Sequence, residues 1–141
     1  MLSALAPWLI AASAGIVLFL GLIHLLYTFH GSKLHPRDPE LKARLAESFL
    51  VITREATIWK IWIGFNASHS FGAILFGSIY GYLSLAHSAF LFQSAFLLLL
   101  GLVSLAAYLF LAKRYWFSAP FNGLLLATAL YTSALVLAFF G

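Results

Sequence analysis

Apolar residues run through most of this chain in long stretches, and polar residues interrupt them at only a few places. Four stretches, at about 8–30, 58–83, 88–112 and 118–140, contain almost no charged residue. Each is near or above the roughly 20 residues that a helix needs to cross the hydrocarbon of a bilayer. The pattern predicts an all-α polytopic membrane protein, an up-down bundle of four transmembrane helices that forms one domain over residues 1–141.

A different pattern lies between the first two stretches. In "PELKARLAESFLVIT" apolar residues recur at helical spacing, at Leu41, Leu45, Phe49 and Ile52, with charged residues between them. This pattern is typical of an amphipathic helix that lies on a membrane surface. We expect such a cytoplasmic helix over about 39–54, either as a lipid-sensing or partner-docking element or as a connector that lies flat.

The composition supports the membrane assignment. Apolar residues make up 63% of the chain and charged residues only 9%, with a mean hydropathy of +1.00. Soluble domains carry about 25% charged residues, so this chain has too few charges to cover a globular surface. The absence of cysteine excludes disulfides and thiolate metal sites.

The basic residues are confined to two short segments and set the expected topology. They are Lys33, Arg37, Lys42, Arg44, Arg54, Lys60, Lys113 and Arg114. By the positive-inside rule, the loops at 31–57 and 113–117 are cytoplasmic and both chain termini lie outside. This topology accounts for the formal net charge of +4 without a nucleic-acid partner. The expected partners are membrane lipids, further copies of the chain or a larger membrane complex.

The second apolar stretch contains an unusual polar segment, "GFNASHSFG", at 64–72. Helices in lipid associate through close contact at small residues and through hydrogen bonds, because lipid removes the hydrophobic driving force between them. Small residues follow this segment at three- and four-residue spacing, and similar positions occur in the first and third stretches. The expected helix-packing positions are Gly21, Ala73, Gly77, Gly81 and Gly101.

Polar residues of three stretches are expected at similar depth. At 1.5 Å rise per residue, His24 and Asn66 lie roughly 9 Å from the cytoplasmic ends of their helices, and His69 roughly 13 Å. Asn122 lies near the cytoplasmic end of the fourth stretch. We therefore expect a candidate ligand site in the cytoplasmic half of the bundle, formed by His24, Asn66, His69 and Asn122.

The residue types restrict the chemistry of this layer. Two neutral imidazoles can ligate haem iron or bond the carbonyl of a quinone or another lipid-like ligand, or can bond polar side chains across helices and fix the packing. No acidic or basic residue lies deep in any stretch, which disfavours carboxylate catalysis and proton relays. A hydrolytic pair of His69 with Ser68 or Ser70 lacks an acid to orient the imidazole.

Three functions remain open from these residues. The first is a non-catalytic or accessory membrane protein that binds a lipid or quinone at the histidine layer. The second is a structural subunit that packs through small-residue faces in a homo-oligomer or a larger membrane complex. The third is a redox protein with haem b held by His24 and His69. His30, His35 and His87 are interpreted as interfacial or turn residues.

Two segments together, "GLIHLLYTFHG" and "GFNASHSFG", resemble those of a group of small, uncharacterised bacterial membrane proteins with four helices. The resemblance spans most of the chain, and Gly-Phe-Asn-x-Ser-His is its most distinctive part. It implies four spans, and it brings no activity, ligand or catalytic residue. The expected location of the chain is a bacterial inner membrane.

Overall fold

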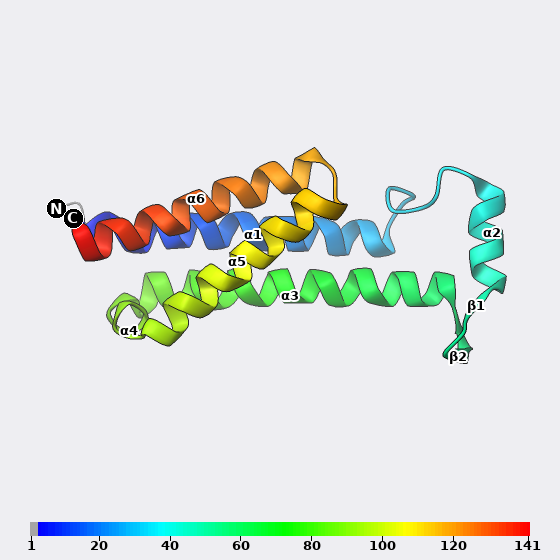
Figure 1. Ribbon diagram of the computed structural model, residues 1–141, viewed down its shortest axis with the longest axis horizontal. Coiled ribbons are helices and arrows are strands. Elements are labelled where there is room, and N and C mark those ends of the chain that lie inside the picture. The colour runs from blue at the N-terminus through cyan, green and yellow to red at the C-terminus, as the bar shows by residue number, and fades with distance from the viewer. Residues whose placement is uncertain (1–2) are drawn as a thin grey trace. The chain divides into compact units, whose positions relative to one another are not determined.

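The computed structural model describes residues 3–141 and confirms the all-α class (Figure 1). After a short 3-10 turn, η1 (Ser3–Leu5), the helices are α1 (Ala6–Phe29), α2 (Pro39–Glu47), α3 (Ile58–Ala86), α4 (Ser88–Gln93), α5 (Ala95–Tyr115) and α6 (Ser118–Phe140). Two short antiparallel strands, β1 (Phe49–Leu50) and β2 (Thr53–Thr57), form a hairpin between α2 and α3.

Three helices in the described part of the chain are long and apolar enough to cross a membrane: α1, α5 and α6. Helix α3 is longer than any of these, at 29 residues, but is not among them. Lys60 and the polar run at 66–70 lower its hydropathy. The structure therefore supports three of the four predicted spans, and the fourth stays a prediction.

The amphipathic helix predicted over 39–54 is wrong in its second half. Helix α2 begins at Pro39, with the Asp38 carboxylate accepting a hydrogen bond from the Glu40 amide. It ends at Glu47, because Ser48 takes an extended conformation (φ −90°, ψ 151°). The following residues pair as a hairpin, in which Phe49 faces Thr57 and Leu50 faces Thr53.

The third apolar stretch, expected over 88–112, is two helices rather than one. Ser88–Gln93 form the short α4, and the long helix α5 begins only at Ala95. Ser94 separates them as the N-cap of α5, with its hydroxyl accepting a hydrogen bond from the Leu97 amide (3.3 Å). The long helix therefore runs later than predicted and ends at Tyr115.

The chain divides into two compact units, where the sequence predicts one domain. The first consists of Met1–Leu20 and Ala73–Gly141, and the second of Gly21–Gly72. Helices α1 and α3 each contribute residues to both units.

The first unit contains the main apolar core. Its most deeply buried large side chains, Ile10, Leu91, Leu105 and Tyr131, come from α1, α4, α5 and α6. A buried hydroxyl adds a polar tie, since Ser13 of α1 donates to the carbonyl of Ala127 in α6 (2.7 Å). Figure 1 shows α6 running beside the first part of α1, and η1 packs against α6.

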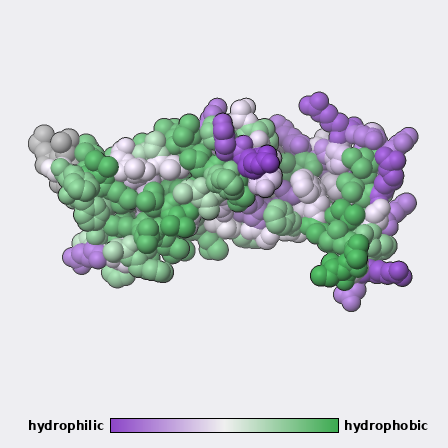
Figure 2. Space-filling model, viewed as in Figure 1, coloured by the Kyte–Doolittle hydropathy of each residue, from purple (hydrophilic) through white to green (hydrophobic). Residues whose placement is uncertain are grey.

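The second unit contains the last turns of α1, the whole loop region and the first half of α3. Gly31 ends the first of these helices with φ +80°, a left-handed conformation that favours glycine at a helix C-terminus. Within this unit, α2 lies across the direction of the two long helices (Figure 1). Figure 2 shows hydrophilic groups concentrated around α2, and a hydrophobic group beside hydrophilic ones at the hairpin.

Candidate functional site

The second unit brings three of the four predicted site residues together. His24 of α1 and Asn66 of α3 form a hydrogen bond between helices, with His24 Nε2 and Asn66 Oδ1 3.0 Å apart. The ring of His69 lies beside that of His24, with centroids 5.5 Å apart and the planes at 82°. We call these three residues the polar cluster.

Local hydrogen bonds hold Asn66 in a defined orientation. Its Nδ2 donates to the carbonyl of Trp62, one turn earlier, at 2.7 Å. This bond identifies the side-chain oxygen as the atom that faces α1, and it makes His24 Nε2 the donor in the bond between helices. Asn66 is only 7% exposed, so both ends of its amide are used within the protein.

Neighbouring hydroxyls bond to the backbone of their own helices. Thr28 donates to the carbonyl of His24 (2.8 Å), and Ser70 donates to the carbonyl of Asn66 (2.9 Å). In the described part of the chain, every buried side-chain nitrogen or oxygen has a hydrogen-bond partner. The buried polar atoms at and around the polar cluster are thus satisfied within the protein, which is what a low-dielectric environment requires.

The geometry of the two imidazoles does not suit axial ligation of haem. Bis-histidine ligation needs the rings on opposite sides of a porphyrin, each directing a nitrogen at the iron. Here the rings are in edge contact, and His24 Nε2 is engaged by Asn66. Among residues 3–141, no three histidine or carboxylate side chains gather as a metal site either.

A second group of polar and aromatic residues lies in the same unit. The rings of His35 and Trp59 are in edge contact (5.0 Å), and Lys42 Nζ lies 3.3 Å from His35 Nδ1 and 5.3 Å from the centroid of Trp59. Trp62 Nε1 donates to the carbonyl of Leu34 at 3.2 Å. These contacts fasten the loop to the start of α3, with a lysine over an aromatic face.

A narrow hollow, too small to admit a water molecule, lies between this group and Asn66 of the polar cluster. Its lining residues are Thr28, Leu34, His35, Trp59, Trp62, Ile63 and Asn66. Sequence reasoning assigned His35 only to the membrane interface or a turn and did not predict this grouping. The available signal was the four-residue spacing from Trp62 to Asn66, which places the two residues one turn apart on the same face of α3.

The fourth predicted site residue, Asn122, belongs to the first unit. It lies exposed near the start of α6 and is not part of the grouping within Gly21–Gly72.

The predicted packing positions lie in both units. Gly21 is buried in the second unit, and Ala73, Gly77 and Gly101 are buried in the first. Gly81 is half-buried, and a Cβ at its position would lie 3.8 Å from Ala14 Cβ, an ordinary contact distance.

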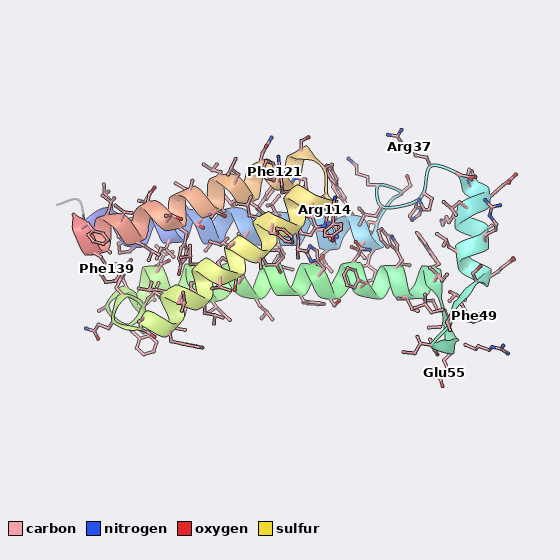
Figure 3. All side chains as sticks on the ribbon, in the orientation of Figure 1. Arg37, Phe49, Glu55, Arg114, Phe121 and Phe139 are labelled. Carbon is pink, nitrogen blue, oxygen red and sulfur yellow. The ribbon has the colours of Figure 1, made fainter. Side chains whose placement is uncertain are left out.

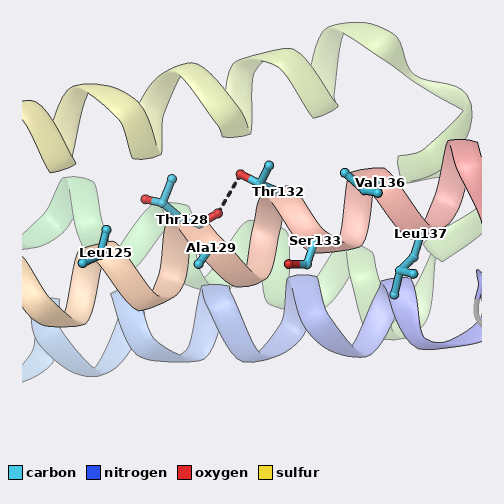
Figure 4. Close-up of a pocket in the computed structure, with 7 residues that line it drawn as sticks. All are labelled: Leu125, Thr128, Ala129, Thr132, Ser133, Val136 and Leu137. Carbon is cyan, nitrogen blue, oxygen red and sulfur yellow. Dashed lines mark hydrogen bonds between the residues drawn. The ribbon is translucent and has the colours of Figure 1, made fainter.

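A larger hollow of about 590 Å³ follows one face of α6 (Figure 4). It is lined by Leu125, Thr128, Ala129, Thr132, Ser133, Val136 and Leu137. Two of its hydroxyls donate to backbone carbonyls of the same helix, Thr128 to Leu124 and Thr132 to Thr128. The lining holds no acidic, basic or metal-ligating side chain, so this hollow is not a candidate catalytic or metal site.

Comparison with protein-family models, curated proteins and solved structures gives no match for this chain.

Proposed function

We propose that the chain is a non-catalytic integral membrane protein with four spans, in which the polar cluster fastens the first spanning helix to the second. In this proposal α3 is the fourth span, in addition to the three helices that qualify by hydropathy. The loops at 31–57 and 113–117 face the cytoplasm of a bacterium, and both termini face outside, as the distribution of basic residues favours. The protein acts as a structural or accessory subunit.

One observation carries the structural role: the hydrogen bond between His24 and Asn66 joins two helices and completes the bonding of a buried amide. Asn66 is buried and bonded at both ends of its amide, and its neighbours bond to their own backbones. A site prepared for a polar ligand would instead present donors or acceptors that lack partners. Interhelical hydrogen bonds of this kind specify packing in membranes.

A double-mutant cycle tests the structural role. We expect His24→Phe and Asn66→Leu each to lower the free energy of unfolding, with a coupling energy of about 0.6 kcal/mol and at most about 1.7 kcal/mol. The cycle is measured by denaturant titration in detergent micelles. Ser68→Ala is the matched control, because this exposed hydroxyl donates only to the carbonyl of Phe65 in its own helix and should change little.

A ligand site is the second candidate, and the partial exposure of its two imidazoles favours it. His24 and His69 are only half-buried, so the head of a lipid or a quinone has a route to the polar cluster. Lipid extraction followed by mass spectrometry separates the two roles. Zero coupling in the cycle, together with a defined lipid that is lost from the His24→Phe protein, would replace the structural role with ligand binding.

The four-span arrangement is tested by single cysteines, because the natural chain contains none. We expect cysteines at Glu47 and Lys113 to react with an impermeant maleimide from one side of sealed vesicles, and a cysteine at His87 from the other side. If α3 did not span, His87 would react from the same side as Glu47. Resistance of the protein to extraction by alkaline carbonate provides an independent test of membrane integration.

A further inference from the structure

The turn of the hairpin exposes two large apolar side chains that touch almost nothing. Val51 and Ile52, which we call the hairpin tip, are 110% and 89% exposed, and the adjacent Phe49 and Leu50 are 48% and 40% exposed. In water such a group is unfavourable, because each Å² of apolar surface costs about 25 cal/mol. Four consecutive exposed apolar residues in a loop indicate that a non-aqueous environment covers them.

The chemistry of the turn points in the same direction. Two-residue hairpin turns in water favour Asn-Gly, Asp-Gly or Gly-Gly, which tolerate positive φ. Here the two central residues are β-branched and apolar, and among the described residues only Gly31 has a positive φ. The tip therefore lacks the residues that make a stable solvated turn and carries apolar volume instead.

The polar and apolar groups of the loop region are segregated within the second unit. The charged residues of β2, Arg54 and Glu55, are exposed, and Figure 3 shows Phe49 and Glu55 on the two strands of the hairpin. In Figure 2 the hydrophobic part of the hairpin lies on the side toward which α3 runs from its first residue, and hydrophilic groups project on the opposite side. The same division is visible along α2.

The first turns of α3 mark the level of a membrane surface. Trp59, Lys60 and Trp62 follow the hairpin directly, and tryptophan with lysine is the combination typical of the membrane–water interface. Because β2 ends at Thr57 and α3 begins at Ile58, the hairpin lies beside these interfacial residues.

We propose that the hairpin tip inserts into the lipid leaflet at which α3 begins, and that the hairpin and α2 together anchor the loop region to the membrane surface. The inference rests on the proposed membrane placement of α3. A lipid leaflet fits this surface better than a protein, because a convex tip of four residues is far smaller than the roughly 800 Å² per partner of a stable interface. Lipid chains can instead surround a convex group from every side.

Single-cysteine labelling tests the insertion with the full-length protein. The Ile52→Cys variant carries an environment-sensitive NBD fluorophore, and the protein is reconstituted in vesicles of phosphatidylcholine and phosphatidylglycerol in equal parts. We expect blue-shifted emission, quenching by a lipid with a nitroxide near its glycerol backbone, and protection from aqueous iodide. The matched control is Glu55→Cys on the charged strand, which should emit as in water and be quenched by iodide. Val51→Cys provides a second tip position if Ile52→Cys fails to fold.

The possible outcomes separate this inference from the proposed function. If the protein floats with the vesicles and resists carbonate extraction but iodide quenches the tip label, the insertion is wrong and the membrane placement stands. If the label is shielded from iodide without quenching by the nitroxide lipid, a protein surface covers the tip and the insertion is also wrong. A protein that does not float with the vesicles overturns both.

Discussion

Replacing Gly77 with leucine is expected to lower the free energy of unfolding by about 3 kcal/mol, the upper end of the usual cost of overpacking. A Cβ at Gly77 would lie 2.7 Å from both the carbonyl oxygen of Ala14 and the amide nitrogen of Leu18. These are backbone atoms of α1, so no side-chain rotation relieves the clash. The helices must separate in the first unit, and the neighbouring core contacts are then lost.

Gly64 provides a matched control on the same helix. A Cβ at Gly64 would meet no other atom within 4 Å, so Gly64→Leu changes the same residue type without a clash. Chemical denaturation of both variants in the same detergent compares them directly. Equal stability of Gly77→Leu and Gly64→Leu would show that α1 and α3 do not approach each other closely at Gly77.

The sequence predicts the helical class and the grouping of polar residues because both follow from helix periodicity. Asn66, His69 and the small residues after them recur at three- and four-residue spacing, which places them on adjoining faces of one helix. His24 has a comparable depth in the preceding long helix, and long helices that follow each other along the chain are usually neighbours. The hydrogen bond between His24 and Asn66 is consistent with this expectation, whereas the position of Asn122 depends on tertiary packing that periodicity does not contain.

The hairpin and the start of α5 escaped prediction for different reasons. The apolar positions at 41, 45, 49 and 52 fit a helix, but the run "FLVIT" is rich in β-branched residues that favour strands. In the third stretch nearly every residue is apolar, so periodicity cannot mark a break. The local signal was Ser94 after Gln93, a residue pair suited to a helix boundary.

Tyr131→Ala is expected to have the largest effect among substitutions that remove atoms, at about 3–5 kcal/mol of unfolding free energy. The side chain of Tyr131 is fully buried, and its ring lies 6.0 Å from that of Tyr80 in an edge-on arrangement. Its hydroxyl donates to the carbonyl of Leu98 at 3.1 Å. Truncation leaves a cavity among α3, α5 and α6. Tyr131→Phe keeps the ring and should cost only about 1 kcal/mol.

Tyr115→Ala is the control for loss of an aromatic ring, because Tyr115 is 70% exposed. In detergent micelles it should change stability by less than about 0.5 kcal/mol. A loss for Tyr131→Ala no larger than that for Tyr115→Ala would contradict the buried position of Tyr131.

Gly101 explains why two tyrosines reach backbone carbonyls that already belong to a helix. Tyr80 donates to the carbonyl of Leu97 at 2.7 Å, and Tyr131 donates to that of Leu98, the residues four and three positions before Gly101. A Cβ at Gly101 would lie 2.7 Å from Tyr131 Cζ and 2.8 Å from Tyr80 Cε1, so any side chain would close the approach. Gly101→Ala should therefore destabilise the wild-type protein by about 1–3 kcal/mol, the usual range for overpacking.

The same change should cost less in the Tyr131→Ala protein, because one of the two rings that it strikes is gone. The two substitutions are then strongly non-additive, as expected for residues in direct contact. Their double-mutant cycle separates a specific contact between Gly101 and Tyr131 from a general loss of core packing, which would make the two effects add. Additive losses would mean that the cost of a side chain at position 101 does not come from contact with the ring of Tyr131.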